Sequence, residues 1–165
     1  MTRPDPLPHL ATLAAALRAQ GQPEATLAAL EQACAATIGH ILFTVLLRHE
    51  ATGEVERFWT SHPAEYPVGG RKPMNPTFWT AQVIEGRRPY IGQDYPAVKA
   101  VFFDHELIRS LGCESVLNVP VAWNGRTLGT INLLHRAGWY GESDIPLAET
   151  IAALAVPAYQ MLVTR

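Results

Sequence analysis

Two stripes of apolar residues at helical spacing lie near the start of the chain. The first predicts a short helix over about residues 9–20, and the second predicts a helix that begins near Pro23 and ends at Gly39. Prolines precede the first stripe, so residues 1–9 are expected to form a flexible lead-in and residues 10–165 a single domain. The stripes consist of Leu10, Leu13, Ala14 and Leu17, and of Leu27, Leu30, Cys34 and Ile38.

Two β-hairpins are predicted from runs that are either apolar throughout or alternate with period two. Residues 40–49 form a short apolar run, and residues 54–59 alternate after a short turn. Residues 114–123 and 126–136 form the second pair of strands. The order of helices and strands predicts an α+β domain, with an antiparallel sheet and helices on its flanks.

The second hairpin carries the clearest turn signal in the chain. Its strands are joined by Asn124 and Gly125, a dipeptide that favours a two-residue type I′ turn. Such a turn pairs residues whose numbers add up to 249, as 123 and 126 do. This register predicts that Asn118 and His135 share one face of the sheet and that Asn132 lies on the other.

Prolines interrupt the segment between the two hairpins. Six of the 13 prolines lie within residues 61–96. We expect a short helix over residues 75–86, a short edge strand over residues 89–92 and a further helix over residues 96–111. The segment is therefore the irregular part of the domain.

A third helical stripe closes the chain. Ser143 or Asp144 is expected to cap this helix, and Pro157 is expected to kink it or to end its regular part. Its apolar positions are Leu147, Ile151, Leu154, Ala158, Met161 and Leu162.

Composition narrows the classes of function. The 13 basic and 15 acidic residues give a formal net charge of −2, and no stretch concentrates basic residues, so nucleic acid is not an expected partner. No run approaches the roughly 18 apolar residues of a membrane span, and the N-terminus lacks the pattern of a signal peptide. We therefore expect a cytoplasmic protein without a membrane partner. The two cysteines, Cys34 and Cys113, are expected to remain free thiols.

The C-terminal third of the sequence resembles a GAF domain. Residues 115–121, SVLNVPV, match a strand motif of that family, and residues 128–133, LGTINL, match the strand that follows the turn. Trp139, Tyr140 and Asp144 then match the aromatic and acidic lead-in to the last helix. The similarity is strong over about 40 residues, whereas upstream the chain agrees with the family in element order and length.

The resemblance implies a central sheet of five or six antiparallel strands. It places the N- and C-terminal helices on one face and the irregular segment on the other, with a ligand pocket under that segment. It also implies a small-molecule sensor or regulatory domain that signals through a partner protein or through homodimerisation by its terminal helices. A fold alone does not choose the ligand, so no cofactor is identifiable and the ligand remains an unknown small molecule.

The candidate pocket residues come from the irregular segment and the second hairpin. Aromatic and polar side chains alternate there, as suits a ligand site, although the same aromatics could instead form a second core under a long loop. Either arginine-containing pair, Arg71 with Lys72 or Arg87 with Arg88, could clamp a carboxylate or phosphate, or could be a solvated surface. The candidate set is Arg71, Tyr90, Asp94, Tyr95, Phe102, Val116, Asn118 and His135.

The buried position expected for Asn118 demands hydrogen-bond partners, either a ligand or neighbouring protein groups. The phytochrome subgroup of the family is similar without gaps over residues 111–135, and that alignment implies that Val116 and Asn118 face the pocket. In the same alignment the two pocket histidines of the subgroup fall on Asp104 and Leu134. A bilin is therefore not expected.

Two other classes of function stay open. One is an enzyme that acts on a small metabolite through Cys113 or His135, although Cys113 has no base beside it in sequence. The other is a ligand-free dimerisation module, suggested by the leucine stripe of the first helix. No metal site is expected, because the cluster at residues 104–106 places adjacent side chains in different directions on a helix.

Overall fold

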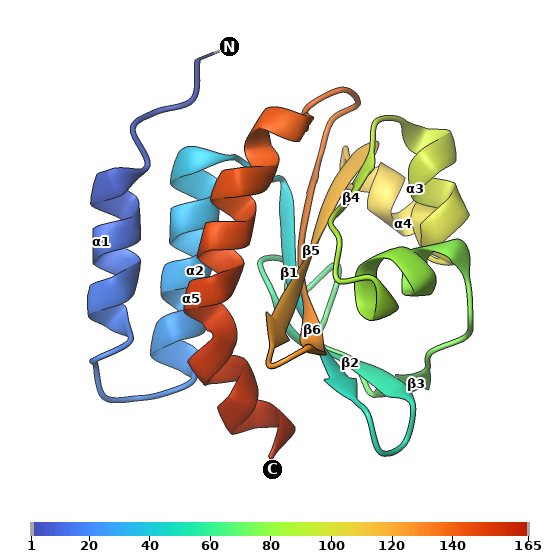
Figure 1. The fold of residues 1–165 in the computed structure, drawn as a ribbon. Helices are drawn as coiled ribbons and strands as arrows, with labels where there is room; N and C mark the ends of the chain where they lie inside the picture. Colours follow the sequence, from blue (N-terminus) through green and yellow to red (C-terminus); the bar gives the residue numbers. More distant parts are fainter. Residues whose placement is uncertain (1, 165) are drawn as a thin grey trace.

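The structure, a computed structural model, describes residues 2–164, which form a six-stranded antiparallel sheet between two layers of helices (Figure 1). The strands lie in the order β3-β2-β1-β6-β5-β4, so the two predicted hairpins meet at the centre through β1 and β6. The predicted α+β class and sheet are confirmed. The strands are β1 (Leu42–His49), β2 (Glu54–Thr60), β3 (Arg71–Pro73), β4 (Tyr90–Gly92), β5 (Ser115–Trp123) and β6 (Arg126–His135).

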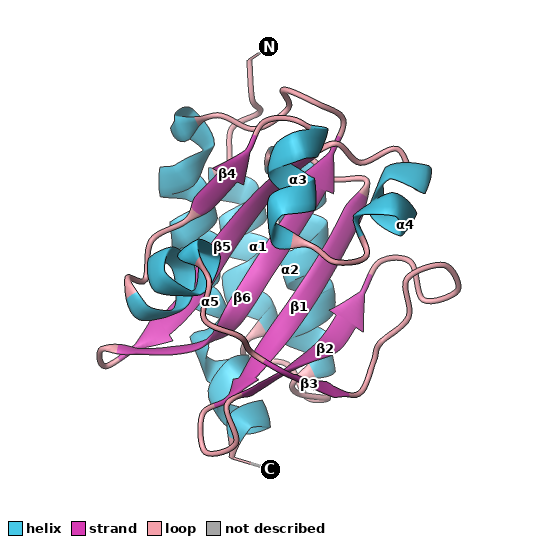
Figure 2. Cartoon of the chain, turned by 90° about the vertical axis from the view of Figure 1, so that its right-hand side faces the viewer, coloured by secondary structure: helices cyan, strands magenta, loops and turns pink. Residues whose placement is uncertain are grey.

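Three helices lie on one side of the sheet, as predicted: α1 (Leu7–Ala16), α2 (Glu24–Thr37) and α5 (Ile145–Val163), the last preceded by a short 3₁₀ turn (Glu142–Asp144). Helices α2 and α5 lie next to the sheet, and α1 packs on their outer side (Figure 1). Shorter helical segments from the irregular part of the chain cover the other face (Figure 2). They are a π-helical turn (Thr80–Glu85), α3 (Tyr95–Val101) and α4 (His105–Ser110). The sheet is therefore buried on both sides, which explains the nearly continuous apolar sequence of its central strands.

Helix α5 is the helix that packs most closely on the sheet, against β5, β6 and β1. Residues Glu142–Val163 are long and apolar enough to span a membrane by composition alone, but eight side chains of α5 are buried in the main core. That core accounts for the apolar side of the helix. Pro157 lies inside α5, which continues to Val163, so this proline does not end the helix.

A β-bulge in the second hairpin changes its predicted register. Asn124 and Gly125 have φ angles of +50° and +74°, as the predicted turn requires, and Trp123 pairs with Arg126. The pairing then shifts by one residue between Val121 and Ala122, with Leu128 as the extra residue of β6. From there onward every residue of β6 faces the side opposite to the one predicted.

The bulge overturns the predicted faces of two residues. Asn118 pairs with Asn132, so both asparagines lie on the same face. His135 pairs with Ser115 and lies on the opposite face from Asn118. The predictions that Asn132 faces away from Asn118 and that His135 shares its face were therefore wrong.

Two predicted helices have different limits in the structure. The first begins at Leu7 and ends at Ala16. It can begin before Pro8 because this proline falls in the first turn, where a helix needs no backbone donor. The helix predicted over residues 96–111 is two helices, separated at Phe102, whose backbone is extended at φ −106° and ψ 124°. Both helices turn apolar residues toward the sheet, so the apolar residues of the two follow one helical spacing in the sequence and predicted a single helix.

Candidate ligand-binding cavity

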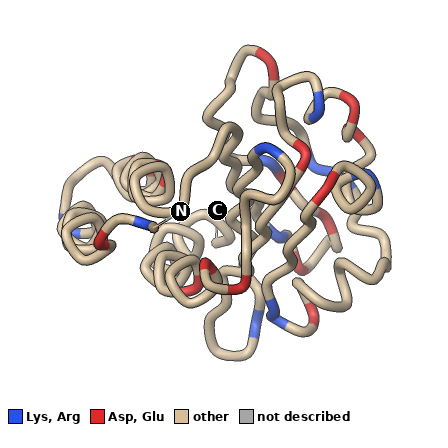
Figure 3. Tube along the Cα trace, turned by 90° about the horizontal axis from the view of Figure 1, so that it is seen from above, with Lys and Arg blue, Asp and Glu red and all other residues tan. Residues whose placement is uncertain are grey.

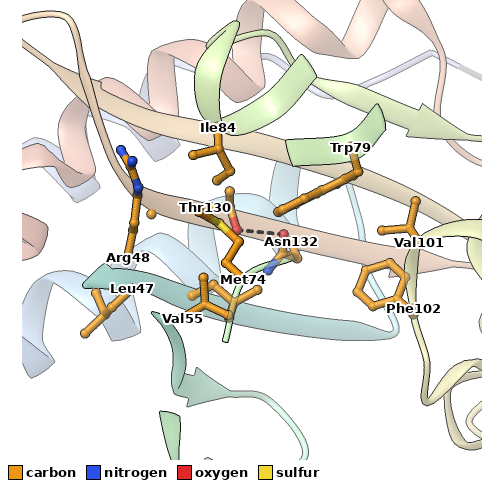
Figure 4. A pocket seen from close by; sticks show the side chains of 12 residues that line it. Leu47, Arg48, Val55, Met74, Trp79, Ile84, Val101, Phe102, Thr130 and Asn132 are labelled. Carbon is orange, nitrogen blue, oxygen red and sulfur yellow. Dashed lines mark hydrogen bonds between the residues drawn. The ribbon is translucent and has the colours of Figure 1, made fainter. Parts of the chain in front are cut away.

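A cavity of about 140 Å³ lies between the sheet and the irregular segment (Figure 4). Its floor is formed by β1, β2 and β6, and its roof by the π-helical turn, the end of α3 and the loop after β3. The walls are mostly apolar, and Asn132, Thr130 and Arg48 supply the polar groups. We call this space the inner cavity, and it is lined by Leu46, Leu47, Arg48, Val55, Met74, Trp79, Ile84, Val101, Phe102, Gly129, Thr130 and Asn132.

A second cavity of about 150 Å³ adjoins the inner cavity along its side. The two share the four lining residues Leu46, Val55, Val101 and Phe102. The side chains of these residues are thus the partition between the two spaces. The remaining lining of the second cavity is Thr44, Arg57, Tyr66, Gly69, Gly70, Lys72, Phe103 and Asp104.

The floor of the inner cavity carries a network of buried polar side chains. Asn118 Nδ2 donates to Asn132 Oδ1 at 2.7 Å, and Asn132 Nδ2 donates to Thr44 Oγ1 at 3.1 Å. Thr130 Oγ1 also donates to Asn132 Oδ1, at 3.0 Å, and Trp79 Nε1 donates to Asn118 Oδ1 at 2.9 Å. The predicted demand of Asn118 for partners is thus met by protein groups, and the network fixes the orientation of Asn132 at the cavity wall.

Gly129 lets the floor of the cavity pack tightly against β1 and α5. A Cβ atom at this position would lie 2.0 Å from the Leu46 carbonyl oxygen and 2.8 Å from Cε1 of Tyr159. On the next residue, the Thr130 carbonyl accepts a hydrogen bond of 2.9 Å from the hydroxyl of Tyr159 in α5. Thr130 therefore contacts the polar network of the cavity through its hydroxyl and the C-terminal helix through its carbonyl.

Arg48 lies at one end of the inner cavity, with Phe102 toward the other end (Figure 4). Its side chain is 20% exposed, and its Nε atom is buried without a hydrogen-bond partner among residues 2–164. Its Nη1 atom lies 3.5 Å from the Thr127 carbonyl and 3.7 Å from a carboxylate oxygen of Glu50. Sequence reasoning missed this residue, although a charged side chain at the end of an apolar strand is a usable signal.

Beyond Arg48, on the outer side, a groove of about 600 Å³ runs between the two hairpin turns and the end of α5. We call it the outer groove, and Arg48 lines both it and the inner cavity. Basic and acidic residues are interspersed along the described chain (Figure 3). The groove follows this pattern, since Glu50 lies among its arginines, Arg48, Arg71 and Arg126.

Of the eight residues predicted to line the pocket, Phe102 lines the inner cavity and Asn118 lies directly behind it. Val116 is fully buried in a second core cluster, which Tyr90 flanks. The hydroxyl of Tyr90 donates to the Ala97 carbonyl at 3.2 Å, and burial raises the pKa of Tyr90. The irregular segment thus contributes both to a core and to a cavity, which combines the two alternatives that the sequence left open.

The remaining predicted residues serve other contacts in this structure. Asp94 caps α3 by accepting from the Ala97 backbone N–H at 3.0 Å, and Tyr95 forms a 2.6 Å hydrogen bond with Nδ1 of His105. Arg71 is about half exposed on the edge strand β3 and lines the outer groove, not the inner cavity. The predicted set therefore does not form one cluster.

His135 lies on the helical side of the sheet, stacked 3.7 Å from the ring of Trp139. Burial, with the nearby charges of Arg136 and Arg3, lowers the pKa of His135. Cys113 is fully buried, and burial raises its pKa to about 12, so its thiol is protonated at neutral pH. The geometry therefore gives no support to a nucleophilic role for this cysteine.

The layers and the cavity define an α+β domain with a space for a small molecule between its sheet and its irregular segment. A model of the GAF domain family matches residues 19–159. The chain therefore belongs to the GAF domain family, as its C-terminal motifs predicted. A search of curated proteins finds no relative of this sequence.

Solved structures of other GAF domains share the fold. The GAF domain of a phosphoenolpyruvate-protein phosphotransferase from Coxiella burnetii aligns with a TM-score of 0.77 and 16% identity, over 96% of this chain and 95% of that chain. The GAF domain of a two-component sensor histidine kinase from Bacillus halodurans aligns with a TM-score of 0.69 and 10% identity, over 87% of this chain and 97% of that chain. The chromophore-binding domain of a bacteriophytochrome from R. palustris aligns with a TM-score of 0.71 and 12% identity, over 94% of this chain and 61% of that chain.

Proposed function

We propose that this GAF domain is a sensory or regulatory module that binds a small molecule in the inner cavity. The observation that carries the proposal is the placement of Asn132 and Thr130, both 1% exposed, in the wall of a mostly apolar space. Ligand sites combine apolar walls with a few fixed polar groups in this way. Proteins of similar fold that sense signals, such as the B. halodurans sensor kinase, are consistent with this role.

The volumes indicate a small ligand. Each of the two adjoining cavities is about half the roughly 300 Å³ at which typical drug-sized sites begin. A ligand that filled both would displace the shared side chains of Val101 and Phe102, at the end of α3. Because the chain breaks between α3 and α4 at Phe102, this segment is the part of the roof that a ligand would rearrange.

The route of the signal starts at Thr130. Its hydroxyl belongs to the network at the cavity floor, and its carbonyl accepts from Tyr159 of α5. A ligand that displaces Thr130 therefore changes a direct contact of the C-terminal helix. This helix and α1 would pass the change to a partner protein or to a second copy of the chain.

The homodimer remains a prediction with a narrower basis than the sequence suggested. Of the leucine stripe in the first helix, Leu13 is fully buried, and Leu10 and Leu17 pack against the main core. Exposed apolar surface on the helical layer includes Leu7 and Met161.

A cytoplasmic location is likewise part of the proposal, supported by two free cysteines that are both buried.

The test is a thermal-shift screen of small metabolites against the purified protein. A bound ligand raises the unfolding temperature by mass action, so a compound at 100 times its Kd adds about 2.7 kcal/mol of stability. The same screen is run on Met74→Trp, which fills the inner cavity, and on Val68→Trp, at an exposed control position. The proposal requires hits that Met74→Trp loses and Val68→Trp keeps. Hits that survive Met74→Trp, or a screen without hits, would contradict it.

A further inference from the structure

We infer that the ligand is a carboxylate attached to a compact apolar group, and that Arg48 binds its charge. This inference rests on the proposed function and adds the chemical class of the ligand. The observation behind it is that Arg48 lacks the close carboxylate partner that two similarly buried arginines, Arg3 and Arg57, have.

The arginines that are buried to a similar degree are firmly paired. Arg3, 24% exposed, contacts both carboxylate oxygens of Asp144 at 3.0 and 3.1 Å. Arg57, 20% exposed, donates to the Pro67 carbonyl at 2.9 Å, approaches Asp104 at 3.4 Å and stacks on Tyr66 at 3.6 Å. Both guanidinium groups therefore have a carboxylate and at least one further contact.

Arg48 is as buried as Arg57 but lacks such partners. Its contacts with Thr127 and Glu50, at 3.5 and 3.7 Å, are at or beyond the limit of a hydrogen bond. Its Nε atom is buried and makes no hydrogen bond within the part of the chain that the structure describes. A buried N–H group without an acceptor costs free energy, and the other contacts of this guanidinium are long, so an anion from outside the chain is the natural complement.

Glu50 does not fill this role. It is 46% exposed, and its Oε2 atom accepts from the guanidinium of Arg126 on the other hairpin. Its other oxygen, Oε1, faces Arg48 but lies 3.7 Å from Nη1, beyond hydrogen-bond distance. Its position also limits the charge of the ligand. This carboxylate repels any anion, but it repels a dianion such as HPO₄²⁻ about twice as strongly as a monoanion, so the geometry favours a single negative charge.

The inner cavity defines the apolar part of the ligand. Its volume of about 140 Å³ is close to the roughly 150 Å³ of an apolar cavity that holds benzene. Met74, Trp79, Ile84 and Phe102 supply apolar walls, and Arg48 lies at one end. A six-membered ring or a branched alkyl group fits this space, with its carboxylate directed toward Arg48.

The experiment titrates ¹⁵N-labelled protein with benzoate, cyclohexanecarboxylate, the neutral isostere benzamide and inorganic phosphate. The readout is the Nε–H signal of Arg48, assigned with Arg48→Lys. At least one carboxylate should shift this signal and bind at least tenfold more tightly than benzamide or phosphate. Arg48→Met should reduce carboxylate affinity at least tenfold, whereas Arg109→Met, which removes an exposed arginine of α4, should leave it unchanged.

Several outcomes would overturn the inference. They are equal binding of benzoate and benzamide, tighter binding of phosphate, an unchanged affinity in Arg48→Met, and no binding of either carboxylate at 10 mM. Arg48→Lys keeps the charge and serves as the second variant if Arg48→Met unfolds. It should retain part of the affinity, because a lysine attracts the anion but lacks the arginine fork. If neutral compounds from the metabolite screen bind in the inner cavity, the proposed function stands and the inference alone fails.

Discussion

Asn118 and Asn132 lie directly opposite each other on β5 and β6 and are joined by a 2.7 Å hydrogen bond from Nδ2 of Asn118 to Oδ1 of Asn132. Both side chains are at most 1% exposed. The pair connects Trp79 in the cavity roof to Thr44 in the central strand β1. It therefore ties the two layers on either side of the inner cavity to each other.

Replacing either asparagine should destabilise the protein, because its partners then lose hydrogen bonds inside the core. We expect Asn118→Leu and Asn132→Leu each to cost about 1–3 kcal/mol in the free energy of unfolding. The double variant should cost less than the sum, since the two side chains share one interaction. Urea unfolding measures the free energy of unfolding of the unmodified protein, the two single variants and the double variant. Additive losses would show that the hydrogen bond between the two residues contributes nothing.

Gly129→Ala should be severely destabilising. The added methyl group would overlap the Leu46 carbonyl and the ring of Tyr159, and neither can move without disturbing the sheet or α5. We expect a loss of at least ~3 kcal/mol, or a failure to fold. Gly70→Ala is the matched control, because its Cβ atom would meet nothing within 4 Å. Similar stability of the two variants would contradict the tight packing at Gly129.

Stability should fall as the pH is lowered from 7.5 to 5.5, in part through His40. Burial lowers the pKa of His40, and the nearby His62 also lowers it, whereas Glu31 acts in the opposite direction. Because the pKa is lower in the folded state, the unfolded chain binds the proton first as the pH falls through about 6.5, and the folded state loses stability. Urea unfolding at several pH values should show a shallower slope for His40→Gln. An equal slope in the variant would exclude His40 as a source of the pH dependence.

Neither cysteine should react readily in the folded protein. Cys34 and Cys113 are buried, and burial raises the pKa of each thiol to about 12. Only the thiolate is a good nucleophile, so alkylation by iodoacetamide at pH 7.5 should be at least ~100 times slower in the native protein than in urea. Mass spectrometry of timed samples measures both rates. Rapid alkylation of native Cys113 would revive the alternative of an enzyme that uses this residue.

Local sequence signals predicted the helices and strands well, but they did not predict which side chains contact one another. The Asn124–Gly125 turn and the periodicity of the flanking strands correctly predicted the second hairpin. The bulge at Leu128 depends on packing between β6 and its neighbours, which no local pattern reports. Because a shift of one residue exchanges the faces of a strand, that single feature moved Asn132 into the site and His135 out of it.

The cavity itself was harder to predict than the fold. The motifs near the end of the chain predicted the GAF fold and a pocket under the irregular segment. Met74, Trp79 and Arg48 meet there only because the loop after β3, the π-helical turn and β1 converge in space. Apolar residues such as Val55 and Val101 look the same in sequence whether they fill a core or line a cavity.

The central claim is that the ligand lies in the inner cavity, and methionine methyl NMR tests it most directly. Met74 lines this cavity, whereas Met161 lies 40% exposed on α5. The strongest hit of the metabolite screen is titrated into protein labelled with ¹³C at the methionine methyl groups. The account predicts a large shift of the Met74 signal and little change at Met161. A shift at Met161 with an unmoved Met74 signal would contradict it, because the ligand would then lie on the helical face.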